Sequence, residues 1–387
     1  AFIPEEYWTL DTNLKVKGEK KPITAKYYGT VDKKQGIANK EQADAIMESL
    51  KNASFKVTDI KRGERIKKAP LPFTTSTLQQ EASKVLNFST QKTMRLAQQL
   101  YEGVDIKGEG TVGLITYLRT DSTRVSEEAE LMAKNFIESQ YGSEYEAGIS
   151  AEKKKSQKIQ DAHEAIRPTD LNRIPVAVKE QLPRDLFRLY QLIWKRFVAS
   201  RMSPAKYETT SVKIQAKDRI FTMAASKMTF DGFMSVYIQE DDKEEENILS
   251  GELNQDSVLE FESFDAKQHF TQPPAHYTEA SLVRALEELG IGRPSTYAPT
   301  ITTILARRYV TKENKNIYVT ELGEVVNRMM KEAFPSIVDV NFTANMEALL
   351  DGVEEDEERL PDLAEKCTCF MAYTIKSQHA VSQTACI

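Results

Sequence analysis

Cysteine is scarce in this chain of 387 residues, since only three occur and all of them lie near the C-terminal end. An odd number of cysteines with none in the body of the chain argues against a disulfide framework. Cys367, Cys369 and Cys386 also fall short of the four ligands of a structural zinc site. The sequence has no run of about 18 apolar residues, and its first residues lack the basic start and apolar core of a signal peptide. These absences predict a soluble cytoplasmic protein.

Positive charge is not in excess either. The chain has 52 Lys and Arg residues against 58 Asp and Glu residues, which gives a formal net charge of −6. The global field does not favour a polyanion, so any nucleic-acid contact must come from local basic patches. The length allows two or three domains, and a hydrophobic content of 40% suits ordinary soluble folds.

Alternating apolar residues predict β structure in two separate parts of the chain. The first part has strands bounded by Gly18 and Gly29, a helix over 40–51 that begins with an Asn39–Gln42 capping box, and a strand over 54–60. The basic segment 61–70 that follows is read as a solvated linker, although it could also contact a nucleic-acid backbone.

The second part, residues 206–266, alternates again and predicts an antiparallel sheet that completes the first one. Its apolar pairs are Val212 with Ile214, Phe221 with Met223, Val236 with Ile238, and Leu259 with Phe261. The acidic cluster 240–246 lacks regular ligand spacing, so we interpret it as a solvated hairpin loop rather than a metal site.

Between these parts the apolar spacing is helical. The segments 77–86 and 90–103 predict a helical hairpin that ends at Gly103, and Ser126 is placed to cap a helix that ends near Gln140. A polar segment, 144–160, is predicted to be a loop, and 183–202 predicts another helix.

The stretch Thr111–Ser122 contains the main candidate catalytic residues of the sequence. If it is a strand, its two-residue period points Tyr117, Arg119 and Asp121 to one face. A phenol, with a pKa near ~10, is a poor nucleophile until a neighbouring charge stabilises its phenolate, and an arginine can also hold a phosphate. The pair therefore suits attack on a phosphodiester, but a simple cross-strand packing pair has the same spacing.

Two further segments contribute candidate side chains. If 161–168 is helical, His163 and Arg167 share one face and Pro168 ends the turn. The C-terminal part has the element order of a winged helix-turn-helix: a helix capped by Thr278, a turn at 290–297, a helix capped by Ser295 that ends near Arg308, and a hairpin around 314–316. Two more helices, over 321–334 and 342–354, are predicted to follow.

The turn at 290–297 allows two interpretations. Arg293, Ser295 and Thr296 sit at a helix N-terminus, where free N–H groups favour a phosphate. Such a turn can equally do no more than join two helices.

Four ordered motifs together resemble the type IA DNA topoisomerases, in particular the bacterial members. They are Gly113–Ser122, Ala162–Pro168 (Ala-His-Glu-Ala-Ile-Arg-Pro), Pro204–Tyr207 and Ser281–Ala298, and the resemblance extends from the first residues to about Leu363. It implies that Tyr117 attacks a phosphodiester of single-stranded DNA and forms a 5′-phosphotyrosine link, with Arg119 and His163 as further catalytic residues. It also implies that negative supercoils are relaxed without ATP.

The resemblance also implies DNA-binding roles. Arg167 and Asp121 would lie near the break, while Arg293, Ser295, Thr296 and Arg307 would guide the upstream strand. Arg308 departs from the family pattern, which often has glycine at this position.

The implied fold is α+β, with an antiparallel hinge domain (1–75 and 206–276) that carries an inserted, mainly helical tyrosine domain (76–205). A helical, winged-helix-like DNA-guiding domain (277–365) and an atypical tail (366–387) follow.

One expected part of the family pattern is missing from the sequence. Type IA enzymes take Mg²⁺-binding carboxylates and a catalytic acid from a TOPRIM domain with an Asp-x-Asp-x-x-x-Glu pattern, which does not occur here. The cysteine-rich zinc modules of many bacterial members are also absent. We therefore expect a monomeric core fragment with no metal or cofactor of its own.

We expect this fragment to bind single-stranded DNA weakly and not to relax negatively supercoiled DNA. We also expect it to act at the bacterial nucleoid without contact with a membrane. The alternatives are a non-catalytic winged-helix module that binds duplex DNA and a purely structural scaffold.

Overall fold

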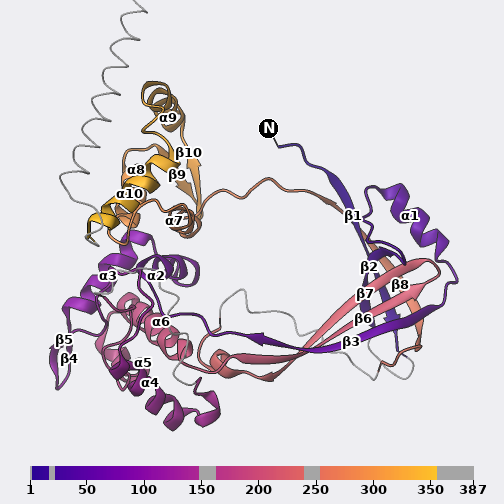
Figure 1. Cartoon of the computed structure of the whole chain (residues 1–387), viewed down its shortest axis with the longest axis horizontal. Helices are drawn as coiled ribbons and strands as arrows, with labels where there is room; N and C mark the ends of the chain where they lie inside the picture. Colours follow the sequence, from indigo (N-terminus) through magenta and orange to yellow (C-terminus); the bar gives the residue numbers. More distant parts are fainter. Residues whose placement is uncertain (1, 17–21, 148–162, 239–252, 355–387) are drawn as a thin grey trace, which may run out of the picture. The chain divides into compact units, whose positions relative to one another are not determined.

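The computed structural model describes residues 2–16, 22–147, 163–238 and 253–354 (Figure 1). Packing divides the chain into two compact units, of which the first combines 1–69 with 202–275 and the second combines 70–201 with 276–387. The acidic cluster 240–246, the tail 366–387 with its cysteines, and most of the predicted loop 144–160 lie outside the described residues.

The first unit is a closed antiparallel barrel of six strands in the order β1-β2-β7-β6-β3-β8. Strands from the two ends of the unit pair directly, as Leu10 of β1 with Ala266 of β8 shows. Alternate apolar residues such as Val212 and Ile214 form its core. The predicted antiparallel sheet is therefore confirmed. The elements are β1 (Glu6–Lys15), β2 (Ile23–Thr30), α1 (Lys40–Ser49), β3 (Phe55–Lys67), β6 (Ala205–Ala216), β7 (Arg219–Phe230) and β8 (Val258–Phe270).

Two local predictions in this unit are wrong. The basic segment 61–67 is not a linker but the second half of β3, paired with β6 from Lys61↔Ser211 to Lys67↔Ala205. Its residues are mostly exposed, so it carries no apolar signal that marks a strand. Val236 and Ile238 lie beyond a short turn, not in a strand, because Gly232 adopts a φ of +49° and packs its backbone against Ser203.

The second unit begins with a helical block in which the predicted N-cap at Ser126 is confirmed. Ser89 and Ser126 accept hydrogen bonds from the first turns of α3 and α4, and Gly103 ends α3 with a φ of +128°. The long helix α6 buries Leu189, Ile193 and other apolar residues. The elements are α2 (Thr75–Glu81) with a π-helical turn (Ala82–Leu86), α3 (Thr90–Glu102), β4 (Val104–Ile106), β5 (Gly110–Val112), α4 (Glu127–Gln140), α5 (Pro175–Val178) and α6 (Arg184–Ser200).

The rest of the second unit has the predicted winged helix-turn-helix order. It consists of α7 (Glu279–Glu288), α8 (Tyr297–Ala306), β9 (Val310–Glu313), β10 (Asn316–Val319), α9 (Glu321–Ala333) and α10 (Val340–Glu354). Thr278 caps α7 as predicted. Ser295 does not cap α8, because the N-cap position falls on Thr296, whose hydroxyl instead accepts from the backbone N–H of Arg293 at 2.8 Å.

Helix α7 is attached to the helical block through two carboxylates. Glu279 accepts hydrogen bonds from the backbone N–H (2.7 Å) and hydroxyl (3.0 Å) of Thr90, the first residue of α3. Glu287 accepts from the hydroxyl of Ser76 in the first turn of α2. Both carboxylates therefore lie at the positive ends of helix dipoles, where a negative charge is stabilised.

Glu279 also forms an ion pair with Lys312 of β9 at 2.7 Å, although the Glu279 side chain is only 3% exposed. Burial opposes ionisation, but the hydrogen bonds and charge of Lys312, together with the bonds from Thr90, hold the pKa of Glu279 below 4.5. This single carboxylate thus joins α3, α7 and β9.

Replacing Glu279 with alanine is expected to destabilise the second unit by about 3 kcal/mol, the low end of the range for a broken buried ion pair, because Lys312 is partly exposed. Glu279→Gln keeps an acceptor for Thr90 and should cost less. Because the folded pKa is lowered, the carboxylate stabilises the fold above pH 4.5 and loses this effect as the pH falls through the lowered value.

Thermal unfolding of wild type, Glu279→Ala and Glu279→Gln between pH 3 and pH 8 tests this contribution of the Glu279 carboxylate to stability. The stabilities of wild type and Glu279→Gln should converge at the acid end. A constant difference across the whole range would contradict the role given to the ionised carboxylate.

The end of α8 contains a strained residue. Arg308 adopts a φ of +58°, and the N–H groups of Arg308 and Tyr309 donate to the carbonyls of Leu305 and Ile304, which is the Schellman pattern. This left-handed position favours glycine, because a Cβ there crowds the backbone. The departure from the family pattern at Arg308 therefore has a conformational cost.

Arg308→Gly is expected to raise stability by about 0.5–1 kcal/mol, the left-handed strain less the entropy that glycine loses on folding. Chemical denaturation measures the change. Arg308→Ala removes the same charge but keeps the Cβ, so it should give no gain; equal stability of the two variants would contradict the explanation.

Candidate active site

The segment that carries Tyr117 is extended but is not the predicted strand. Only Gly110–Val112 is a strand, and from 113 to 126 the ladder is reduced to one bridge between Ile115 and Pro168. A side chain replaces the missing strand partner. The hydroxyl of Thr75 donates to the Leu118 carbonyl (2.7 Å) and accepts from the Thr120 N–H (2.9 Å), while the Thr75 N–H donates to the Thr120 carbonyl (2.8 Å).

The predicted two-residue period nevertheless persists in this extended segment. Leu118 and Thr120 are buried, whereas Tyr117 is half-buried and Arg119 and Asp121 are exposed. The three predicted side chains thus share the open side of the loop. No sequence pattern predicts that Thr75 holds this loop in place, because a threonine in the first turn of a helix has no distinctive pattern.

His163 and Arg167 reach this loop from an extended segment, not from the predicted helix. The N–H of Thr116 donates to the Arg167 carbonyl, and the N–H of Arg167 donates to the Thr116 hydroxyl, both at 2.9 Å. The N–H of Ile166 donates to the Phe73 carbonyl at 2.8 Å. These contacts use the backbone groups that a helix needs, so 163–168 runs beside the tyrosine loop.

The ring of Tyr117 lies between two others. The His163 ring is 4.6 Å away, between ring centroids, at an interplanar angle of 39°, and the Tyr101 ring at the end of α3 is 5.5 Å away in a T-shaped arrangement. These contacts hold the phenol while leaving it half-exposed. The structure therefore brings Tyr117 and His163 together.

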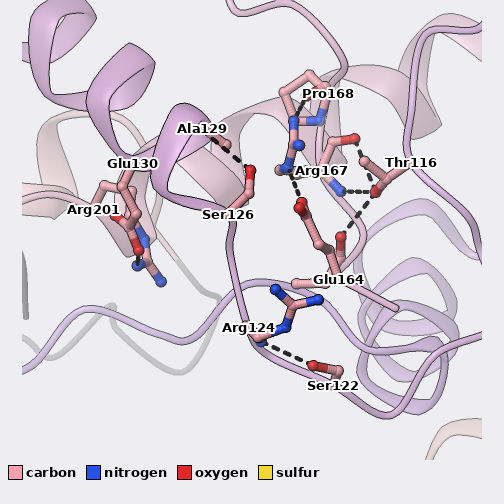
Figure 2. A network of polar contacts seen from close by, with 11 residues as sticks. Thr116, Ser122, Arg124, Ser126, Ala129, Glu130, Glu164, Arg167, Pro168 and Arg201 are labelled. Atoms are coloured by element: carbon pink, nitrogen blue, oxygen red, sulfur yellow. Dashed lines mark hydrogen bonds and ion pairs between the residues drawn. The ribbon is translucent and has the colours of Figure 1, made fainter. Parts of the chain in front are cut away.

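Arg167 is engaged within its own segment. Figure 2 shows its guanidinium pointing at the carboxylate of Glu164, with Nε 2.7 Å from Oε2. A second nitrogen donates to the Pro168 carbonyl at 3.1 Å. Burial opposes ionisation of Glu164, but Arg167, with help from Ser126 and Arg124, holds the pKa of this carboxyl below its ordinary value. Glu164 is a site residue that the sequence analysis did not select.

Arg119 and Ser295 line one groove of about 380 Å³ between α3 and α8. Asp121 also lies close enough to α8 to act on Tyr297. Burial and the charges of Glu287 and Asp121 raise the pKa of Tyr297 to about 12, against the opposing charge of Arg293. The exposed side of the tyrosine loop therefore lies near the beginning of α8.

Arg293 is not open for a phosphate in this structure. Its guanidinium forms a bidentate pair with Asp351 of α10 (Nε–Oδ1 3.1 Å, Nη2–Oδ2 2.5 Å), and Nη1 donates to the Gly292 carbonyl at 2.8 Å. Glu347 lies 3.9 Å away. The hydrogen bonds to Asp351 raise the pKa of Arg293 above its ordinary value. The Thr296 hydroxyl is also engaged, with the backbone of Arg293.

Arg307 is exposed at the other end of α8 and is not brought together with Arg293. A helix of ten residues separates them by about 15 Å. The predicted DNA-guiding residues thus line the length of α8 instead of forming one cluster.

No group of three or more His, Cys, Asp or Glu side chains that could hold a metal ion occurs within the described ranges. Asp121 lies on the tyrosine loop and Glu164 on the segment of His163, where Glu164 is paired with Arg167. These two acids therefore do not form a Mg²⁺ site on their own.

An antiparallel barrel interrupted by a helical block with an accessible tyrosine, followed by a winged segment, is the architecture of a bacterial DNA topoisomerase. A family model described as DNA topoisomerase matches residues 1–365. The solved structure of full-length topoisomerase I from Thermotoga maritima is 36% identical, with a TM-score of 0.82 over 97% of this chain and 59% of that one.

The chain therefore belongs to the DNA topoisomerase family, and its resemblance to the bacterial type IA members is confirmed. It spans 59% of the length of the Thermotoga protein.

Removing the charge that neutralises Arg293 is expected to strengthen binding to single-stranded DNA. In Asp351→Asn the guanidinium loses its bidentate charge partner and keeps only Glu347, 3.9 Å away, so a phosphate can compete for it. One added phosphate contact of about 1 kcal/mol corresponds to roughly fivefold tighter binding. The slope of log K against log salt should steepen by about 0.7. Fluorescence anisotropy of a labelled oligonucleotide measures both.

Glu288→Gln is the matched control, because it removes one carboxylate from an exposed ion pair with Arg284 on α7. Weaker binding by Asp351→Asn would contradict the prediction and indicate that Asp351 positions Arg293 for DNA.

Proposed function

We propose that this chain is the DNA-breaking core of a type IA topoisomerase, in which Tyr117 cleaves and reseals one strand of DNA. The main support is the position of Tyr117, which is held half-exposed between His163 and Tyr101 within a motif of the family. The family match over 1–365 supports the same assignment.

In the proposed reaction the phenol oxygen of Tyr117 attacks the phosphorus of a phosphodiester in single-stranded DNA. The bond from phosphorus to the 3′ oxygen breaks, the phenol gives up one proton, and the leaving 3′ oxygen takes up one proton to become a hydroxyl. The product is a 5′-phosphotyrosine link, and the reverse reaction reseals the strand. Because one phosphodiester replaces another, no ATP is needed, and passage of DNA through the break relaxes negative supercoils.

The surrounding side chains have positioning and electrostatic roles in this proposal. Arg119, exposed two residues after Tyr117, holds the phosphate, and His163 orients the phenol through ring contact. Arg167, Asp121, Arg293, Ser295, Thr296 and Arg307 are proposed to contact or guide the DNA strand. Among them, Arg293 contributes only when a phosphate displaces Asp351.

We propose that Mg²⁺ and the catalytic acid are supplied by a TOPRIM domain outside this chain, because the described acids near Tyr117 do not form a metal site on their own. When bound, the metal supplies charge stabilisation for the phosphate. The isolated chain is accordingly proposed to bind single-stranded DNA as a monomer without relaxing supercoiled DNA.

We also propose a cytoplasmic location at the nucleoid. No helix in the described ranges has the length and apolarity needed to cross a bilayer.

The alternative is a non-catalytic winged-helix module that binds duplex DNA. Of the two lysines in the wing hairpin, Lys312 is paired with the buried Glu279, which leaves Lys315 for that purpose. The two functions differ in substrate preference, because the topoisomerase core should prefer single strands and the winged module duplex.

Tyr117→Phe is expected to abolish activity, because phenylalanine has no nucleophile to form the covalent link. The assay places the chain in one polypeptide with a TOPRIM domain and measures relaxation of a negatively supercoiled plasmid with Mg²⁺. In parallel, cleavage of a labelled oligonucleotide is stopped with denaturant, which should leave protein attached to the 5′ end of the break.

Tyr101→Phe is the matched control, because it keeps the ring against Tyr117 and should retain activity. Relaxation by Tyr117→Phe would mean that another residue is the nucleophile. Relaxation by the isolated chain would show that it carries its own acids.

A further inference from the structure

The groove of about 380 Å³ between α3 and α8 has a mainly apolar lining that also includes several polar side chains. Met94 of α3 and Pro294 and Pro299 at the start of α8 are among its apolar lining residues, and Gln91 and Arg119 are among its polar ones. A concave apolar surface with a few polar groups is the usual form of a site for an organic ligand.

The polar side chains of this groove are unengaged. Within the described parts of the chain, Gln91, Arg119, Ser295 and Thr303 form no side-chain hydrogen bond or ion pair, whereas Thr302 beside them bonds to the Ala298 carbonyl. Arg293, which lies beside the groove residue Pro294 in the sequence, is by contrast paired with Asp351. The groove thus combines apolar walls with free donors and acceptors.

The chemistry of the lining restricts the ligand. No acidic residue lines the groove, and its charged residue is Arg119, so the ligand has an anionic group near Arg119 and a flat, weakly polar part against Met94 and the prolines. The Gln91 amide supplies both a donor and an acceptor, which match the edge of a nucleobase. Arg119 is two residues from Tyr117, about 7 Å along an extended chain.

We propose that this groove binds one unstacked nucleobase of the single strand, next to the phosphate held at Arg119. The proposal rests on the proposed function, since it assumes that single-stranded DNA reaches Tyr117. An extruded base can lie against Met94 and Pro299 and present its edge to Gln91, whereas a base stacked in a duplex cannot. The groove therefore contributes to the choice of single strands and of the cleavage position.

The first test uses a mononucleotide, which needs neither a long strand nor cleavage. The methionine methyl groups of the chain are labelled with ¹³C, and Met94→Leu identifies the signal of Met94. Titration with nucleoside 5′-monophosphates should shift this signal, and Gln91→Trp, which fills the groove from an exposed helix position, should abolish the shift. Gln99→Trp, exposed on the same helix away from the groove, should leave it unchanged.

The second test measures the affinity of the chain for oligonucleotides in which one abasic site is moved along the strand. One position should weaken binding at least about fivefold, the low end of what one bidentate base contact contributes, and Gln91→Trp should remove this dependence. Tight binding with equal effects at all positions, or no shift of the Met94 signal, would overturn the base site while leaving the proposed function intact. A shift with mononucleotide but no oligonucleotide binding would instead count against the proposed function.

Discussion

The position of Tyr117 depends on hydrogen bonds between the backbone of its loop and the first residue of α2. The first turn of a helix has N–H groups without partners, and the loop has carbonyl and N–H groups without a neighbouring strand. Thr75 connects the two sets through its backbone N–H and its hydroxyl. Because these bonds turn Leu118 and Thr120 inward, Tyr117 and Arg119 are left on the open side. The nucleophile proposed here is therefore placed by a helix start and not by a sheet.

Charge pairing decides which cations of this acidic chain can meet a phosphate. Arg167 is bound to Glu164 and Arg293 to Asp351, so a phosphate must compete with a carboxylate at both positions. In the described parts of the chain Arg119 has no such partner. The free positive charge near Tyr117 is thus concentrated two residues from the phenol. This arrangement favours one phosphate position over general attraction of the DNA backbone.

Local periodicity and capping predicted most of the fold. The helix α6, the cap at Ser126 and the end of α3 at Gly103 are as expected, because their signals lie within a few residues of each other. Two of the wrong elements are set by distant partners. Segment 61–67 is a strand because β6 pairs with it, and 163–168 is extended because Phe73 and Thr116 bond to its backbone.

The same distinction applies to the site. The period of two was enough to place Tyr117, Arg119 and Asp121 on one side, since that depends only on an extended backbone. The contact of His163 with Tyr117 and the pairing of Arg293 with Asp351, 58 positions apart, depend on tertiary packing and have no local pattern. A motif thus identifies the residue types of a site, but whether a given arginine is free or neutralised follows only from the carboxylates that the fold brings to it.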